Sequence, residues 1–307
     1  MPEGFYNVVN YNVVNVTQGL NLHPLTQRVI TSLLAFCSLL VVMWVGLPLL
    51  GPIYIILCIL MLNEYSLMMN VRGIPIRKRS LWIATVLTLP ASLPVTYDGI
   101  IQMQPLFDGV SWREAVIGFF TFYLVALEVI RPNQNSLYSL VFTMFGYLYI
   151  PWLLGFGISL RYTPDGVLGL WHLMLALLAV FASDIGAYTF GRLFGERKLA
   201  PSISPNKTLE GSLGGLGFAM FTVSVMAWVL ETWLGINLDL YDALLFGILV
   251  ASAAQIGDLF ESLIKRWAGV KDSGTLMPGH GGVLDRMDSI IFALPLTYFF
   301  VTLVILR

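Results

Sequence analysis

The sequence predicts an all-α, polytopic integral membrane protein with about nine transmembrane helices. Hydrophobic residues make up 57% of the 307 residues and charged residues only 11%, whereas soluble domains carry about 25% charged residues. Nine apolar stretches are long enough to cross a hydrocarbon core about 30 Å thick as helices. Because backbone groups in lipid must bond to one another within a segment, we expect each stretch to be helical.

The expected elements follow one another with few long connections. The spans are residues 29–49, 52–69, 81–97, 114–130, 136–158, 167–191, 209–235, 240–264 and 288–306. Residues 1–26 form a polar N-terminal tail that lacks the basic start of a signal peptide. Short connections at residues 51–52 and 235–239 predict helical hairpins. We expect residues 27–165 to be a scaffold of about five helices, and residues 166–307 to hold about four helices and the chemically active loops.

Lysine and arginine indicate the orientation. If successive connections between the spans lie on alternate sides of the membrane, 14 of the 17 Lys and Arg residues fall on one side. The positive-inside rule identifies that side as the cytoplasm. We therefore expect a multi-pass protein of the inner (plasma) membrane with a cytoplasmic N-terminus and a cytoplasm-facing site. The net charge of −1 gives no indication of nucleic-acid binding, and two isolated cysteines provide no zinc site.

The first candidate cluster begins with Ser183, Asp184 and Tyr188. Asp184 follows a long apolar run, and a charge there needs a functional reason. The loop that follows supplies four further candidates, Ser204, Asn206, Lys207 and Thr208. Lys207 and Thr208 stand at the start of the next helix, where free N–H groups favour phosphate. The alternative is that the basic residues of this loop only obey the positive-inside rule.

The second cluster is the run from Asp258 to Arg266. Asp258, Glu261 and Lys265 are spaced at i, i+3 and i+7, which places them on one helix face. A charge in the bilayer costs about 2.5–3.5 kcal/mol, so Asp258 and Glu261 are expected to face a partner or water. For Glu261 and Lys265 the alternative is an ordinary interfacial charge pair.

The third cluster is a loop rich in glycine and proline, from Lys271 to Gly282. Clustered glycines, here Gly279, Gly281 and Gly282, let backbone N–H groups approach phosphate oxygens closely. Among them His280 is a general acid, a phosphate donor or a turn residue.

Two aspartates, Asp285 and Asp288, lie one turn apart at the start of the last helix, on either side of Arg286. Acidic residues also suit the positive end of a helix dipole, which is an alternative explanation for one of them. Together with Asp258, they exceed what capping needs. Carboxylates near glycine-rich backbone suit Mg²⁺, which takes oxygen ligands and is usually shared with substrate phosphates.

Residues 262–288, SLIKRWAGVKDSGTLMPGHGGVLDRMD, resemble the signature of the phosphatidate cytidylyltransferase (CDP-diacylglycerol synthase) family. Every fixed position matches, and only Met277 departs from the usual Ile, Leu or Phe. The segment SDIGAYTFGRLFG…KLAPSISPNKTLEG resembles the second block of the same family. The two segments cover most of residues 183–289, whereas the N-terminal half matches only in being hydrophobic.

The resemblance implies transfer of CMP from CTP to phosphatidic acid, a membrane lipid, giving CDP-diacylglycerol and pyrophosphate. It also implies a homodimer and Mg²⁺ held by Asp258 and Asp285, with room for a second, monovalent cation such as K⁺. The implied catalytic residues are Asp258, Asp285, Lys207, Lys265, Arg266, Lys271, Arg286 and His280. The implied substrate-binding residues are Ser183, Asp184, Tyr188, Ser204, Asn206, Thr208, Glu261, Gly279, Gly281, Gly282 and Asp288.

Three other functions compete with this interpretation. A CDP-alcohol phosphotransferase would show Asp-Gly-x-x-Ala-Arg, which no Asp-Gly pair here continues. A lipid or polyprenol kinase would depend on ATP, and the sequence has no P-loop. A transporter would carry charges near the membrane midplane, whereas those here gather at one face.

Overall fold

The computed structural model describes residues 38–93, 111–132, 134–236, 238–274 and 281–306. The chain divides into two compact units, residues 1–44 and 45–307, and every element named below belongs to the second. Apart from one two-stranded hairpin, these elements are helices, so the predicted all-α class is confirmed. The predicted division at residues 165 and 166 stays a prediction.

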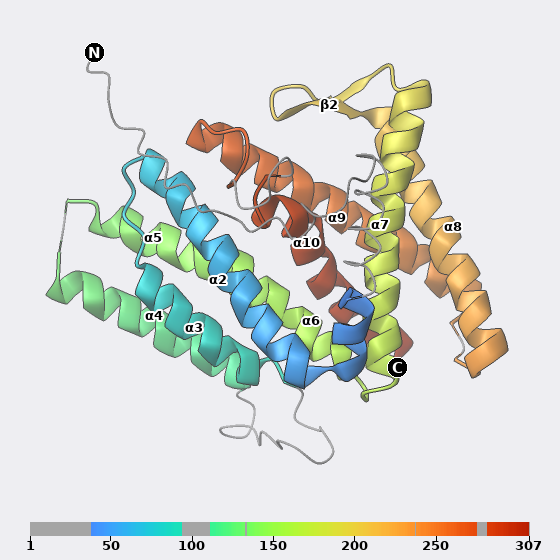
Figure 1. Cartoon of the computed structure of the whole chain (residues 1–307), viewed down its shortest axis with the longest axis horizontal. Coiled ribbons are helices and arrows are strands. Elements are labelled where there is room, and N and C mark those ends of the chain that lie inside the picture. Colours follow the sequence, from blue (N-terminus) through green and yellow to red (C-terminus); the bar gives the residue numbers. More distant parts are fainter. Residues whose placement is uncertain (1–37, 94–110, 133, 237, 275–280, 307) are drawn as a thin grey trace, which may run out of the picture. The chain divides into compact units, whose positions relative to one another are not determined.

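The described helices and strands are given below in chain order and are labelled in Figure 1 where there is room. They are α2 (Leu47–Val71), α3 (Lys78–Ala91), α4 (Trp112–Ile130), α5 (Ser136–Tyr147), η1 (Leu148–Trp152), α6 (Leu153–Arg161), α7 (Leu168–Phe194), β1 (Lys198–Ala200), β2 (Ser204–Thr208), α8 (Leu209–Leu234), α9 (Leu240–Ala268), α10 (Leu284–Phe300) and η2 (Val301–Ile305). The π-helical turn η1 joins α5 to α6, so residues 136–161 form one long helical segment.

Six helical segments are long and apolar enough to cross a membrane, which supports a membrane protein. They are Leu47–Val71, Ser136–Arg161, Leu168–Phe194, Leu209–Leu234, Leu240–Ala268 and Leu284–Ile305. The predicted count of nine is not confirmed among the described residues. The expected span 81–97 appears as α3, which has only 14 residues. The expected span 114–130 appears as α4, which carries Arg113, Glu114 and Glu128. Residues 29–37 of the expected span 29–49 lie outside the described residues, and its last three residues belong to α2.

The predicted hairpin turn at residues 51–52 is wrong. Helix α2 runs through Gly51 and Pro52, and the break precedes it at Gly46, whose φ is 76°. Glycine adopts this left-handed conformation without the penalty of a Cβ, whereas apolar membrane helices tolerate an internal proline. The other predicted turn is confirmed, because α8 ends at Leu234, Gly235 has a φ of 66°, and α9 begins at Leu240.

Helices α7 and α8 approach each other closely, and the β1–β2 hairpin joins them at one end (Figure 1). A Cβ built on Gly215 of α8 would lie 2.7 Å from the backbone oxygen of Ser183 in α7. Small residues allow this kind of backbone approach between membrane helices. The close packing fixes the start of α8 beside the polar end of α7.

Helices α9 and α10 also meet through a glycine. A Cβ on Gly257 would lie 2.5 Å from the backbone oxygen of Asp288. An aromatic cluster packs beside this contact, with ring centroids of Phe260 and Phe292 5.5 Å apart and those of Tyr149 and Phe260 5.5 Å apart. As a result, Asp258 of α9 is held next to the first turns of α10.

Candidate active site

Two cavities adjoin at the end of the C-terminal helices that bears the hairpin. The larger, of about 500 Å³, is lined among others by Asp184, Tyr188, Asn206, Lys207, Thr208 and Asp258. The smaller, of about 260 Å³, is lined among others by Asp184, Asp258, Lys265, Asp285, Arg286 and Asp288. Asp184 and Asp258 line both cavities. Ten of the sequence-predicted site residues, from the four elements α7, β2, α9 and α10, therefore line these two adjoining cavities.

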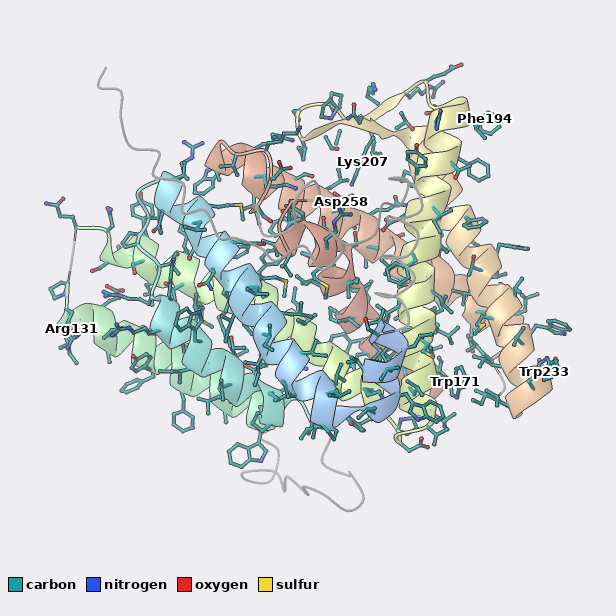
Figure 2. The ribbon with its side chains drawn as sticks, viewed as in Figure 1. Arg131, Trp171, Phe194, Lys207, Trp233 and Asp258 are labelled. Carbon is teal, nitrogen blue, oxygen red and sulfur yellow. The ribbon has the colours of Figure 1, made fainter. Side chains whose placement is uncertain are left out.

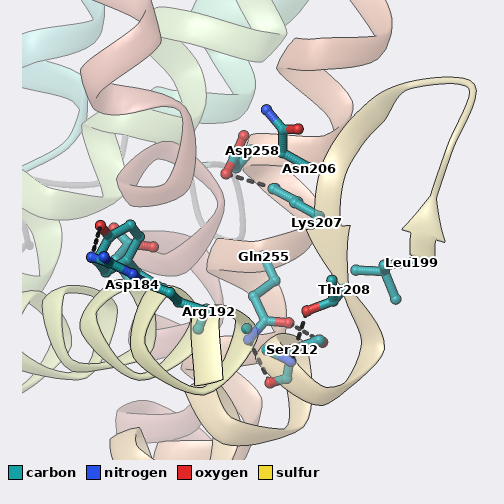
Figure 3. Close-up of a pocket in the computed structure, with 13 residues that line it drawn as sticks. Asp184, Arg192, Leu199, Asn206, Lys207, Thr208, Ser212, Gln255 and Asp258 are labelled. Carbon is teal, nitrogen blue, oxygen red and sulfur yellow. Dashed lines mark hydrogen bonds and ion pairs between the residues drawn. The ribbon is translucent and has the colours of Figure 1, made fainter. Parts of the chain in front are cut away.

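The hairpin brings Lys207 to Asp258. Lys207 is the next-to-last residue of β2, and its Nζ lies 2.6 Å from Oδ2 of Asp258 in α9 (Figures 2 and 3). Antiparallel pairing of Lys198 with Thr208 fixes the register of the hairpin. Thr208 then caps α8, because its hydroxyl accepts a hydrogen bond from the Gly211 N–H at 3.2 Å. The strand and the cap together set where the Lys207 ammonium points.

A glutamine one turn before Asp258 ties three helices together beside the larger cavity. The Gln255 amide donates to the Ser183 hydroxyl at 3.2 Å. It also donates to the Ser212 carbonyl at 3.1 Å, and the Ser212 hydroxyl donates back to the Gln255 oxygen (Figure 3). These bonds join α7, α8 and α9. Ser183, predicted to bind substrate, is fully buried within this network.

A second lysine–aspartate pair joins α9 to α10. Nζ of Lys265 lies 2.6 Å from Oδ1 of Asp285 and also contacts the fully buried Glu261. Oδ2 of Asp285 accepts hydrogen bonds from the Gly282 N–H at 2.7 Å and from the Ser273 N–H at 3.0 Å. The predicted Glu261–Lys265 pair is therefore present, and Lys265 shares its charge between two carboxylates.

The carboxylates around the smaller cavity have the donor chemistry of a hard cation. Asp184, Asp258, Asp285 and Asp288 line it, with Lys265 and Arg286 as the basic residues. Within the described ranges, no three His, Cys, Asp or Glu side chains are placed to hold one ion by themselves. Mg²⁺ is commonly bound by one or two carboxylates together with substrate phosphates. The residues present fit an ion that arrives with a phosphorylated substrate.

Several predicted residues lie outside the lining of both cavities. Arg266 is exposed and donates to the carbonyls of Ile203 at 3.3 Å and Val270 at 3.2 Å. Lys271 is exposed, and Ser204 begins β2. Three further predicted residues contact Lys265 or Asp285 and do not line either cavity: Glu261, Gly281 and Gly282. His280 and Gly279 lie outside the described residues.

The structure adds residues that the sequence prediction missed. They are Glu64, Arg192, Ser212, Gln255 and Ser273. Gln255 precedes Asp258 by one helical turn, a spacing that could have singled it out. Glu64 is an isolated acidic residue within an apolar span, which is the same signal that drew attention to Asp184.

Comparison with known proteins identifies the family. The model of the Cytidylyltransferase family matches residues 26–304. The chain belongs to this family. A phosphatidate cytidylyltransferase of Synechocystis sp. is 33% identical over 303 residues, covering 91% of this chain and 97% of the relative. The predicted family resemblance is thereby confirmed.

Two staphylococcal members of the cytidylyltransferase family share shorter matches with the chain. The phosphatidate cytidylyltransferase of Staphylococcus haemolyticus is 42% identical over 176 residues, covering 57% of this chain and 64% of the relative. That of Staphylococcus epidermidis is 37% identical over 201 residues, covering 64% of this chain and 74% of the relative. The match with the first therefore spans slightly less than two thirds of its length.

Proposed function

We propose that this member of the cytidylyltransferase family transfers CMP from CTP to phosphatidic acid, giving CDP-diacylglycerol and pyrophosphate in phospholipid biosynthesis. The observation that supports it best is the meeting of two lysine–aspartate pairs, Lys207–Asp258 and Lys265–Asp285, at adjoining cavities. Lysines and carboxylates in one place suit a polyphosphate that carries a metal ion. The names of the relatives indicate the same reaction.

The reaction needs little proton chemistry. A phosphate oxygen of phosphatidic acid, already an anion, attacks the α-phosphorus of CTP. A new oxygen–phosphorus bond forms as the bond from the α-phosphorus to the bridging oxygen breaks, and pyrophosphate leaves with that electron pair. Catalysis then depends on positioning and on neutralising phosphate charge.

Basic side chains from three elements supply that charge. Lys207 reaches the shared carboxylate Asp258 from the hairpin, while Lys265 of α9 and Arg286 of α10 line the smaller cavity. We assign these three to the phosphates of CTP and of the lipid. The exposed Arg266 and Lys271 are proposed to contact phosphate at the surface of the protein. His280 and the glycine turn 279–282 are proposed to contact the nucleotide.

We propose that Asp258 and Asp285 hold Mg²⁺, with a monovalent cation such as K⁺ near Asp288 or Glu261. A bound Mg²⁺ supplies neutralisation of phosphate charge during transfer. Lys265 shares Oδ1 of Asp285, so its ammonium and the carboxylate stay close to the reacting phosphates.

The lipid substrate is proposed to enter from the side of α7. Tyr188 lines the larger cavity and has 68% of its surface exposed, and Ile185 and Leu193 of the same helix are also exposed apolar residues. Asp184 and Tyr188 would then border the lipid headgroup. We further propose a homodimer in the inner (plasma) membrane with the cavities facing the cytoplasm, so that CTP arrives from the cytosol.

The test is incorporation of label from CTP into lipid by the purified protein in detergent, with and without phosphatidic acid. Labelled CDP-diacylglycerol that requires phosphatidic acid, CTP and Mg²⁺ is the expected result. Phosphorylation of lipid by ATP instead would indicate a kinase. Substrate flux into vesicles without CTP would indicate a transporter.

A further inference from the structure

Glu64 of α2 is a buried carboxylate far from the family signature in sequence. It is 6% exposed, in a helix predicted to be apolar scaffold. Its Oε1 accepts a hydrogen bond from the Val283 N–H at 2.9 Å, and its Oε2 accepts one from the Leu284 N–H at 2.8 Å. These partners lie 219 and 220 residues away along the chain.

These two bonds cap helix α10 from another part of the chain. The first N–H groups of a helix have no partner within it and are usually satisfied by a Ser, Thr, Asp or Asn at the N-cap. The N-cap of α10 is Val283, which has no acceptor side chain. Glu64 supplies both the acceptor oxygens and a negative charge at the positive end of the helix dipole.

The same contacts lead directly to Asp285. Ser273 stands between the two acidic residues, with its hydroxyl oxygen 3.1 Å from Oε2 of Glu64 and 2.9 Å from Oδ2 of Asp285. A hydroxyl has one proton, so Ser273 donates to one carboxylate at a time. Because Leu284 immediately precedes Asp285, fixing its N–H also fixes the backbone from which the Asp285 carboxylate extends.

Two glycines of the signature loop make room for Glu64. A Cβ on Gly282 would lie 2.5 Å from Oε2 of Glu64, and a Cβ on Gly274 would lie 2.7 Å from Oε1. Gly281 has a φ of 83°, and a Cβ there would lie 2.7 Å from Oδ2 of Asp285. The described part of this loop therefore folds around two protein carboxylates, a role distinct from binding phosphate.

We propose that Glu64 is a positioning residue of the transferase site: it caps α10 and thereby holds Asp285 in the orientation that Lys265 and a bound cation require. The proposal rests on the proposed function. It assigns to the N-terminal half a role in the chemistry that the family signature does not include.

The test compares Glu64→Gln with Glu128→Gln, a buried glutamate of the same half that pairs with Arg77 away from both cavities. In Glu64→Gln one of the two acceptor oxygens becomes an NH2 group, which cannot accept a hydrogen bond from the backbone N–H that it faces. We expect kcat for CMP transfer to fall about 10- to 100-fold, since small misplacements of reacting groups have effects of this size. The Mg²⁺ concentration for half-maximal rate should rise about tenfold, and the KM for CTP should change less than about threefold. Glu128→Gln should leave all three values unchanged.

Amide hydrogen exchange provides a measurement that does not depend on activity. Glu64→Gln should speed exchange at residues 282–286 and leave the other helices as in the wild type. A wild-type kcat and Mg²⁺ requirement in Glu64→Gln would overturn the proposal. So would a loss of activity that follows a lowered melting temperature and faster exchange along the whole chain.

A second variant covers the case in which Glu64→Gln does not fold. Ser273→Ala removes the hydroxyl between the two carboxylates and leaves the backbone bonds to Glu64. It should lower kcat about threefold to tenfold and raise the Mg²⁺ requirement, and unchanged values would overturn the proposal. If the wild type itself transfers no CMP, the proposed function fails, while the exchange measurement still tests the cap.

Discussion

Ion pairs occur in both halves of the second unit. Among the described residues, those of the C-terminal half line the two adjoining cavities, whereas Arg77 and Glu128 of the N-terminal half line neither of them. In the N-terminal half, Arg77 binds both oxygens of Glu128, at 2.7 and 2.8 Å, and joins the start of α3 to α4. The hydrogen bond to Glu128 raises the pKa of the Arg77 guanidinium above its usual value. In the C-terminal half, Lys207–Asp258 and Lys265–Asp285 face open space. Lysine or arginine paired with a carboxylate therefore joins helices in one half and lines cavities in the other.

The largest effect is expected from removing the carboxylate of Asp258, which lines both cavities. Asp258→Ala should lower CMP transfer about 10³-fold, because it removes a charge that faces both cavities and that we assign to the cation. The melting temperature should stay near that of the wild type, since the Asp258 side chain is 36% exposed. Asp285→Ala should also lose nearly all activity. Normal turnover in both variants would exclude the proposed metal site.

Replacing the lysine of the hairpin should have the next largest effect. Lys207→Gln keeps much of the side-chain length and removes the charge, and charge-assisted contacts are worth about 1.5–3 kcal/mol. We expect kcat/KM for CTP to fall about 10- to 100-fold. Lys198→Gln, at an exposed position of the same hairpin, is the matched control and should have little effect. Equal losses in the two variants would mean that the hairpin acts through its net charge alone.

The N-terminal pair should respond in the opposite way. Glu128→Gln leaves Arg77 without its carboxylate and should lower the free energy of unfolding by about 1–2 kcal/mol, less than for a fully buried pair because the Arg77 side chain is 27% exposed. Activity per folded molecule should not change. Thermal denaturation and specific activity, measured on the same preparation, separate the two effects, and a lower kcat at full folding would contradict the assignment.

The smallest effects should come from two helix caps, one in each half. Ser111→Ala removes the capping box of α4, and Thr208→Val removes the cap of α8. Each should cost about 1 kcal/mol of stability. Only Thr208 lines a cavity, so only its variant should change the KM for CTP or phosphatidic acid. A changed KM in Ser111→Ala would show that α4 also influences substrate binding.

The sequence predicted those features that depend on local chemistry. Apolar length predicted the helices, since lipid leaves the backbone no other partners. The short connection between two apolar spans predicted the turn at residues 235–239. Helical spacing placed Asp258 and Lys265 on one face of a helix, and Asp285 and Asp288 lie one turn apart at the start of the next. Lys207 was recognised because it stands directly before a helix.

Other features depend on contacts between distant segments, which a single sequence does not contain. Gly46 and Gly51 are both plausible turn residues, and only the surrounding structure decides that the break falls at Gly46. Arg266 matches the family signature, yet in the structure it donates to the backbone carbonyls of Ile203, in the hairpin turn, and of Val270, just after α9. Glu64 stands out as an acidic residue in an apolar span, but its partners, about 200 residues further along the chain, are visible only in the structure.

The bond between Glu64 and the start of α10 has a consequence for dividing the protein. A fragment made of α7 to α10 would contain both segments that resemble the family but would lack the acceptor for two backbone donors at the start of α10. We expect such a fragment to be inactive when expressed alone and to regain CMP transfer when the N-terminal helices are supplied as a separate chain. On the proposed role of Glu64, grafting residues 183–289 onto another membrane scaffold would require a matching acidic residue from that scaffold.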